Sequence, residues 1–89
     1  MAYRLVARPQ VDRDMESFPQ KVQRQILKQF KALEANPRNY RSEKLEGYDD
    51  QPHYRVYSGS YRIIYVIDDA AKLVTVTDVG HRKDVYRRF

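Results

Sequence analysis

The dipeptide formed by Gly59 and Ser60 is the feature that most constrains the fold of this 89-residue chain. It separates two segments, 53–58 and 61–68, that are rich in β-branched and aromatic residues. Such segments on either side of a two-residue turn are typical of a β-hairpin. Glycine in the first turn position favours a type II′ turn, whose twist matches that of paired strands. The chain is therefore predicted to contain an antiparallel hairpin here.

The hairpin determines which residues of the two strands face each other. With a two-residue loop, Tyr57 lies opposite Arg62 and Arg55 lies opposite Ile64, and directly opposed residues share a face of the sheet. A three-residue loop at 58–60 would instead move Arg55 and Tyr57 to the other face. The two-residue loop is the prediction adopted, and it gathers two arginines and a tyrosine on one face.

A third strand is predicted at 73–79, and an even-length loop before it sets Val66 opposite Thr75 and Arg62 opposite Val79. The face expected to carry the helices then holds Tyr54, Val56, Tyr61, Ile63, Tyr65, Ile67, Val74 and Val76. The opposite face holds Arg55, Tyr57, Arg62, Ile64, Val66, Thr75, Thr77 and Val79.

The first third of the chain reads as a short strand at 3–7 followed by two amphipathic helices. Pro9 can open the first helix, because proline is favoured in the first helical turn. Val11, Met15 and Phe18 are spaced four and three residues apart, which places them on one apolar stripe.

The second helix is predicted to begin at 17–20, where Ser17 and Gln20 have the spacing of a capping box. It is predicted to end at Asn36, because a residue before proline is disfavoured in the helical region. Its apolar face consists of Val22, Ile26, Phe30 and Leu33. Its basic side consists of Lys21, Arg24, Lys28 and Lys31. A solvated face and an RNA-binding face are both compatible with that basic side.

Together these elements predict an α+β fold, an N-terminal helical hairpin packed on a small, mainly antiparallel four-stranded sheet. Residues 38–52 are polar and rich in turn formers, and they are expected to be irregular. Residues 1–89 are expected to form a single domain, since a chain of this length supports one core. The composition, 42% hydrophobic and 33% charged, is that of a globular protein.

Composition also bounds the function. The formal net charge of +5 favours a polyanionic partner such as nucleic acid. The chain has no cysteine and only two histidines, so no disulfide framework or common metal-ligand spacing is present, and no cofactor is expected. No apolar run approaches the roughly 18 residues of a membrane span, and no signal peptide is recognisable. A cytoplasmic protein that does not contact a membrane is therefore expected.

Five residues are predicted to gather at one end of the sheet. Arg55, Tyr57 and Arg62 share a face there, and Arg82 and Tyr86 follow just beyond the third strand. Guanidinium groups bind phosphate oxygens in pairs, and tyrosine rings stack on exposed bases. An ordinary cross-strand cation–π pair between Tyr57 and Arg62 is the structural alternative. The number of such residues favours a nucleic-acid site.

In order and spacing, the segments 3–6, 44–47, 54–68 and 79–87 resemble the RelE/ParE toxin superfamily. The resemblance spans essentially the whole chain and implies the toxin of a type II toxin–antitoxin system. RelE-like members are ribosome-dependent endoribonucleases, or mRNA interferases, that cut mRNA in the ribosomal A site and inhibit translation. The cleavage they catalyse needs no metal, because the ribose 2′-OH attacks the adjacent phosphate. The resemblance implies no small-molecule substrate.

The resemblance also implies roles for individual residues. Arg62 and Arg82 would stabilise the charge that develops on the phosphate, and Tyr86 would stack on a base or assist proton transfer. Arg55 and Tyr57 stand where the best-known members carry two lysines; Arg55 can still bind phosphate, but Tyr57 cannot replace a cationic acid–base group.

The general base stays open among His81, Tyr57 and Tyr86, since imidazole titrates near neutral pH. The other residues expected to contact RNA are Lys44, Lys83 and Arg87. The expected partners are a cognate antitoxin, RelB-like or similar, together with the ribosome and mRNA.

Two other functions are compatible with the resemblance. A ParE-like toxin on the same fold poisons DNA gyrase without RNA chemistry, and an inactive module would bind RNA or the ribosome without cutting. The presence of both Arg82 and Tyr86 favours the nuclease, because gyrase poisons generally lack that pair.

Overall fold

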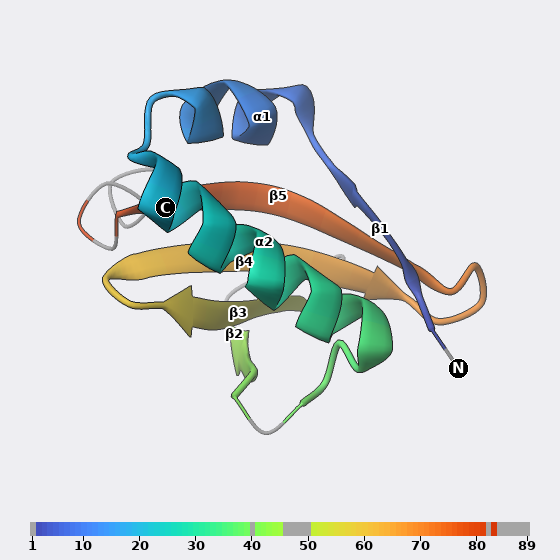
Figure 1. The fold of residues 1–89 in the computed structure, drawn as a ribbon. Helices are drawn as coiled ribbons and strands as arrows, with labels where there is room; N and C mark the ends of the chain where they lie inside the picture. Colours follow the sequence, from blue (N-terminus) through green and yellow to red (C-terminus); the bar gives the residue numbers. More distant parts are fainter. Residues whose placement is uncertain (1, 40, 46–50, 82, 84–89) are drawn as a thin grey trace.

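The computed structural model describes residues 2–39, 41–45, 51–81 and 83 and shows two helices and a five-stranded sheet (Figure 1). The elements are β1 (Arg4–Ala7), α1 (Pro9–Glu16), α2 (Gln20–Ala35), β2 (Glu43–Leu45), β3 (His53–Ser58), β4 (Tyr61–Asp68) and β5 (Leu73–His81). The strand order is β1-β5-β4-β3-β2, in which β1 is parallel to β5 and every other pair is antiparallel. The predicted α+β class with a mainly antiparallel sheet is confirmed.

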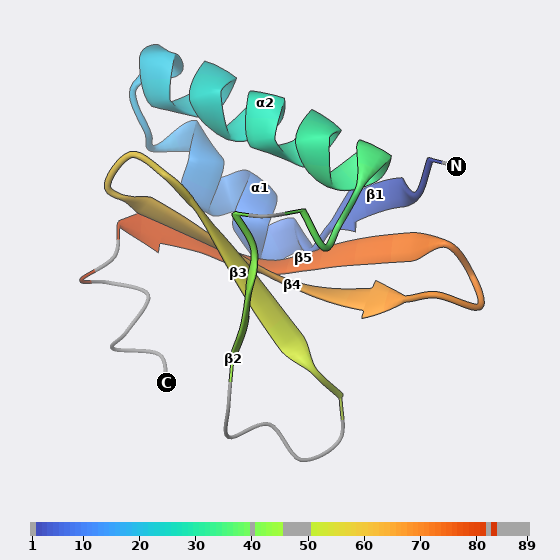
Figure 2. The same cartoon turned by 90° about the horizontal axis from the view of Figure 1, so that it is seen from below.

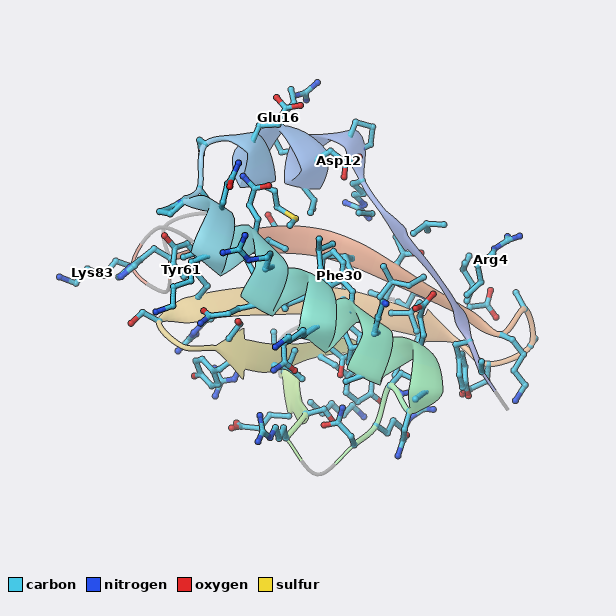
Figure 3. All side chains as sticks on the ribbon, in the orientation of Figure 1. Arg4, Asp12, Glu16, Phe30, Tyr61 and Lys83 are labelled. Atoms are coloured by element: carbon cyan, nitrogen blue, oxygen red, sulfur yellow. The ribbon has the colours of Figure 1, made fainter. Side chains whose placement is uncertain are left out.

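Both helices lie on the same side of the sheet (Figure 2). On α1, Val11 and Met15 are buried, whereas Glu16 points away from the sheet (Figure 3). On α2, Ile26, Phe30 and Leu33 form the buried stripe that periodicity predicts. None of the helices in the described ranges is long and apolar enough to cross a membrane.

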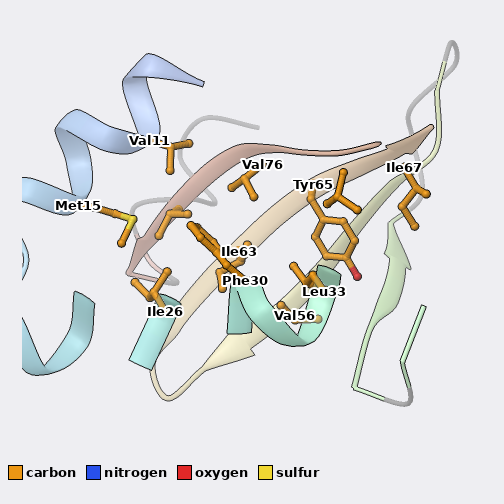
Figure 4. Packing of buried hydrophobic residues seen from close by; sticks show 12 residues of the cluster. Val11, Met15, Ile26, Phe30, Leu33, Val56, Ile63, Tyr65, Ile67 and Val76 are labelled. Carbon is orange, nitrogen blue, oxygen red and sulfur yellow. The ribbon is translucent and has the colours of Figure 1, made fainter. Parts of the chain in front are cut away.

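The core lies between the helices and one face of the sheet (Figure 4). Strands β3, β4 and β5 contribute Val56, Ile63, Tyr65, Ile67, Val74, Val76 and Val79, with Tyr54 and Tyr61 packed against them. Eight of these nine are the residues predicted to face the helices, so that prediction is confirmed; the ninth, Val79, was predicted on the other face.

The strand count differs from the prediction because β2 was expected to be irregular. Its three residues pair antiparallel with the start of β3, Glu43 opposite Arg55 and Leu45 opposite His53. So short a polar segment carries no alternating apolar signal, and only its pairing with β3 makes it a strand. Residues 46–50 lie outside the described part of the chain.

Two of the three predicted helix ends are confirmed. α1 starts at Pro9 and α2 ends before Asn36, whose backbone is extended. The capping box at the start of α2 is wrong, since the N-cap is Pro19 and makes no side-chain cap bond. The Ser17 hydroxyl instead donates to the Asp14 carbonyl at 2.7 Å and closes the end of α1. Ser17 therefore caps the helix before it.

The β3–β4 turn has the predicted geometry. Gly59 has a φ of +60°, a conformation that glycine adopts without steric cost and that a type II′ turn requires at its first position. Tyr57 pairs with Arg62 and Arg55 pairs with Ile64, as the two-residue loop predicts. The register of the hairpin is confirmed.

The register between β4 and β5 is confirmed at Val66 and Thr75 and wrong beyond a bulge between Ile64 and Tyr65. Tyr65 pairs with Val76 and Ile64 with Asp78, so one extra residue, Thr77, stands on β5. Arg62 consequently pairs with Gly80 and not with Val79. An extra residue exchanges the faces of all residues that follow it, which is why Val79 lies in the core.

Candidate functional site

Arg55, Tyr57 and Arg62, which we call the Arg62 cluster, come together on the sheet face opposite the helices. The Arg62 Nη2 donates to the Tyr57 hydroxyl at 2.7 Å. The guanidinium carbons of Arg62 and Arg55 lie 4.9 and 5.5 Å from the centre of the Tyr57 ring. Two cations thus share one phenol, a geometry within the range of cation–π contacts.

Burial distinguishes the members of the cluster. Arg62 is only 6% exposed, whereas Tyr57 is 37% exposed. A nearly buried guanidinium is held in one orientation by its surroundings, so little side-chain entropy remains to be lost when an anion binds. The Tyr57 hydroxyl accepts the bond from Arg62 and keeps its own proton to donate. The cluster therefore presents a fixed cation beside an exposed hydroxyl donor.

Glu43 joins the site from β2, and sequence analysis did not identify it. Its carboxylate accepts a hydrogen bond from Arg55 Nη2 at 2.8 Å across the β2–β3 pair. The Arg55 side chain is 20% exposed and that of Glu43 is 59% exposed. Only the prediction of β2 would have placed Glu43 next to Arg55, since twelve residues separate them in the chain.

His81 lies on the other face. The bulge in β5 places it opposite Tyr61, with the two rings 5.7 Å apart and edge to face. Phe18 packs on the same tyrosine at 4.8 Å. The predicted register would have put His81 on the face of Arg62, and that placement is wrong. A role for His81 in acid–base chemistry stays a prediction.

The remaining predicted residues are not brought into the Arg62 cluster by the described structure. Lys44 is exposed on β2 and pairs with Tyr54, which places it on the helix-covered side. Lys83 is exposed, and its backbone N–H donates to His81 Nδ1 at 3.4 Å; Figure 3 shows Lys83 at the same end of the molecule as Tyr61. The predicted residues that lie outside the described residues are Arg82, Tyr86 and Arg87.

A second polar group, which we call the Asp69 cluster, lies just beyond the other end of β4. Both Asp69 carboxylate oxygens accept bonds from Arg38, at 2.9 and 2.8 Å, and Oδ1 also accepts the Tyr3 hydroxyl at 2.7 Å. The hydrogen bonds from Arg38 and Tyr3 lower the pKa of Asp69 to about 2, and the carboxylate raises the pKa of Arg38 above its ordinary value. The cluster ties the residue before β1, the segment after α2 and the β4–β5 turn together.

Within the described ranges, no three His, Asp or Glu side chains are grouped so that they could hold a metal ion. The chemistry open to the Arg62 cluster is that of cations and a hydroxyl acting on an anion, for which a phosphodiester is a suitable group.

Comparisons with known proteins agree with this fold. The family model for the ParE toxin of the type II toxin–antitoxin system parDE matches residues 3–86. A search of curated proteins finds no match.

Solved structures provide further relatives. A chain of the archaeal RelE–RelB complex from Pyrococcus horikoshii OT3 is 30% identical, with a TM-score of 0.78, over 92% of this chain and 97% of that chain. The intact RelBE toxin–antitoxin complex of E. coli contains a chain that is 26% identical, with a TM-score of 0.73, over 90% of this chain and 96% of its own. The toxin–antitoxin complex RelBE2 from Mycobacterium tuberculosis shares the fold at 23% identity and a TM-score of 0.81, over 92% and 100% of the two chains.

The family match runs through nearly the whole chain, and the archaeal relative is 30% identical over most of it. This chain belongs to the RelE/ParE superfamily and is a toxin of a type II toxin–antitoxin system.

Proposed function

We propose that this toxin is a ribosome-dependent endoribonuclease that cuts mRNA in the A site. In the reaction the ribose 2′-oxygen forms a bond to the neighbouring phosphorus, and the bond from that phosphorus to the 5′-oxygen breaks. The 2′-hydroxyl proton leaves to a base, and the departing 5′-oxygen takes up a proton. The products are a 2′,3′-cyclic phosphate and a free 5′-hydroxyl, so no water, metal or cofactor is consumed.

The observation that carries the proposal is the Arg62–Tyr57 hydrogen bond of 2.7 Å at a nearly buried guanidinium. A preorganised cation stabilises charge that develops in a transition state without reorganising as the reaction proceeds. Arg62 would face a non-bridging phosphate oxygen, and the exposed Tyr57 hydroxyl would donate to the same phosphate. Arg55 would contact an adjoining phosphate, with Glu43 limiting its rotation.

Other residues would complete the site. We assign Arg82 a second contact to the charged phosphate and Tyr86 a stacking contact or a proton transfer, with Lys83, Arg87 and Lys44 contacting RNA farther away. The general base remains to be chosen among His81, Tyr57 and Tyr86. His81 would reach the RNA only around the end of the sheet, because it faces the side of Tyr61.

Residues 1–89 would act as one toxin domain in the cytoplasm, where the ribosome and mRNA are its targets. A RelB-like antitoxin would neutralise it, as the RelE–RelB complex of the 30% identical archaeal relative suggests. The antitoxin would act by covering the Arg62 cluster.

A second candidate function is the poisoning of DNA gyrase. The matched family model, which describes the ParE toxin of parDE, favours it. The Arg62 cluster favours the nuclease, because a gyrase poison needs no preorganised phosphate site. A binding module without catalysis is the third possibility.

Induction of the toxin in cells, followed by mapping of mRNA 5′ ends, tests these functions. We expect growth arrest with new 5′-hydroxyl ends inside codons and only in translated messages. Arrest with DNA damage and intact messages would establish the gyrase poison. Arrest with ribosomes occupied and messages uncut would establish the binding module.

A further inference from the structure

A groove lined mainly by polar and charged residues lies between α2 and the β3–β4 turn, and no proposed role yet accounts for it. Its volume is about 270 Å³, and it is lined by Gln25, Lys28, Gln29, Arg41, Tyr57, Ser58 and Gly59. Tyr57 belongs both to this groove and to the Arg62 cluster, so the groove continues from the candidate site around the edge of β3. We call it the α2 groove.

The charge of the α2 groove suits an anion. Lys28 and Arg41 lie on its wall, and no acidic side chain is among the lining residues that the structure describes. Both cations are on exposed residues, which can move toward a phosphate. A chain of phosphates that passes Arg62 can therefore continue past Arg41 and Lys28.

Two glutamines give the α2 groove a means of selecting a base. Gln25 and Gln29 are one helical turn apart and therefore share a face of α2, and both line the groove. Within the described structure neither amide has a hydrogen-bond partner, whereas the Gln23 amide donates to the Phe18 carbonyl and the Gln10 amide donates to Asp14. An amide offers a donor and an acceptor side by side, which matches the edge of a base.

The volume of the α2 groove limits the size of the ligand that it can bind. Pockets that enclose drug-sized ligands have volumes of roughly 300–1,000 Å³, and the α2 groove is smaller. A Cβ atom added at Gly59 would meet no other atom within 4 Å, so the turn leaves room for a single strand of RNA to pass. One nucleotide of a longer single strand fits these dimensions better than a free ligand does.

We propose that the α2 groove binds an RNA nucleotide that flanks the cleaved bond, and that Gln25 and Gln29 read its base. The inference rests on the proposed nuclease function and makes the toxin itself, in addition to the ribosome, a source of sequence preference. The nucleotide belongs to the message; a ribosomal RNA nucleotide would have the same chemistry, and the test separates the two sources.

The test compares the wild type, the double variant Gln25→Ala/Gln29→Ala and the matched control Gln20→Ala, an exposed glutamine on the same helix outside the groove. Messages are mapped at their 5′ ends after induction. We expect the base preference at one position beside the cut to fall about fivefold or more in the double variant, because a bidentate contact to a base discriminates by that order. Total cleavage should fall less than about tenfold, and Gln20→Ala should match the wild type.

A second variant, which places a carboxylate in the α2 groove, tests base reading more directly. Gln29→Glu replaces a donor–acceptor pair with acceptors alone, so bases that offer an amino group should become preferred and uracil should be cut less often at that position. A variant that folds, as its circular dichroism melting curve would show, and that changes the preferred base supports the inference directly.

The outcomes against the inference are distinct. Uniform loss of cleavage at every codon with an unchanged preference would mean that the groove contacts ribosomal RNA and would overturn base reading. Unchanged cleavage and preference in both groove variants would mean that the groove binds no RNA. Absence of cut messages with the wild type would instead overturn the proposed nuclease function, irrespective of the groove.

Discussion

The two arginine–tyrosine clusters at opposite ends of β4 are built from similar side chains but are suited to different tasks. In the Asp69 cluster, Arg38 binds a carboxylate through two hydrogen bonds, and Tyr3 donates to the same carboxylate. In the Arg62 cluster, Arg62 donates to the Tyr57 hydroxyl. A carboxylate carries a charge opposite to that of the guanidinium, whereas a hydroxyl only accepts a hydrogen bond from it.

The two clusters also differ in the exposure of their side chains. If both were purely structural, the oppositely charged pair would be expected to be the more buried one, but it is the more exposed. The Arg38 and Asp69 side chains are 45% and 56% exposed, whereas Arg62 is 6% exposed. Solvent screens the exposed pair, so it contributes little to stability. Burial of a cation costs free energy, and the proposed binding of an anion would give a reason for that cost. We therefore expect the Asp69 cluster to have a modest structural role and the Arg62 cluster to serve the proposed function.

The largest effect should follow from Arg62→Ala. We expect mRNA cleavage to fall by about 100- to 1,000-fold, the loss typical of removing one preorganised stabilising group. Arg38→Ala, the matched change at the other end of β4, should leave cleavage within about threefold of the wild type. Counting cut messages per induced cell measures both.

Arg62 is buried, so its loss can also disturb folding. Arg62→Lys keeps the charge but not the planar fork, and it should fold and retain an intermediate activity. Full activity in a folded Arg62→Ala protein would contradict the division of roles between the two clusters.

Tyr57→Phe should have the next largest effect. It keeps the ring between the two arginines and removes the hydroxyl that holds Arg62. We expect cleavage to fall about tenfold, which corresponds to about 1.4 kcal/mol of transition-state free energy. Tyr3→Phe removes the equivalent hydroxyl of the Asp69 cluster and should leave cleavage unchanged. If cleavage fell equally in Tyr57→Phe and Tyr3→Phe, at equal amounts of soluble protein, the two clusters would not differ in function.

The Arg62 cluster could be predicted from the sequence because it depends on a local signal. A glycine turn sets the hairpin register, and alternation along β3 and β4 then determines which residues share a face. The placement of Arg55, Tyr57 and Arg62 needed no long-range information.

The rest of the site depends on contacts that no local pattern encodes. The extra residue at Thr77 is stabilised by a bond from its hydroxyl to the Ile64 carbonyl, 3.3 Å away on β4, and nothing in the alternation before it signals the bulge. That one residue determines the face of His81. Glu43 and the α2 groove were missed for the same reason, since both arise where separate segments meet.

Tyr65→Phe tests whether the end of β4 near the Asp69 cluster contributes to stability, because it removes a buried hydrogen bond there. The Tyr65 hydroxyl donates to the Pro37 carbonyl at 2.6 Å, next to Arg38, and burial raises the pKa of Tyr65 to about 12. Removal of the hydroxyl leaves a buried carbonyl without its donor, which should lower the free energy of unfolding by about 1–2 kcal/mol. Urea denaturation measures the change, and Tyr61→Phe at the other end of β4 is the control. A loss of cleavage in folded Tyr65→Phe protein would count against the assignment of stability alone to this end.

The smallest effect should come from Asp69→Asn, and its dependence on pH identifies the cause. The hydrogen bonds from Arg38 and Tyr3 lower the pKa of Asp69 from its ordinary 3.8 to about 2. Because the pKa of Asp69 is lower in the folded state, its carboxylate stabilises the protein when the pH is above the pKa of the unfolded state. This contribution decreases as the pH falls from 3.8 toward 2. The wild type should therefore be slightly more stable than Asp69→Asn at neutral pH, and the difference should shrink steadily as the pH falls from 3.8 toward 2. Thermal unfolding of both proteins between pH 2 and 7 measures the difference. If it instead stayed constant down to pH 2, the carboxylate charge would not be what stabilises this end of β4, and the contrast with Arg62 would have to rest on geometry alone.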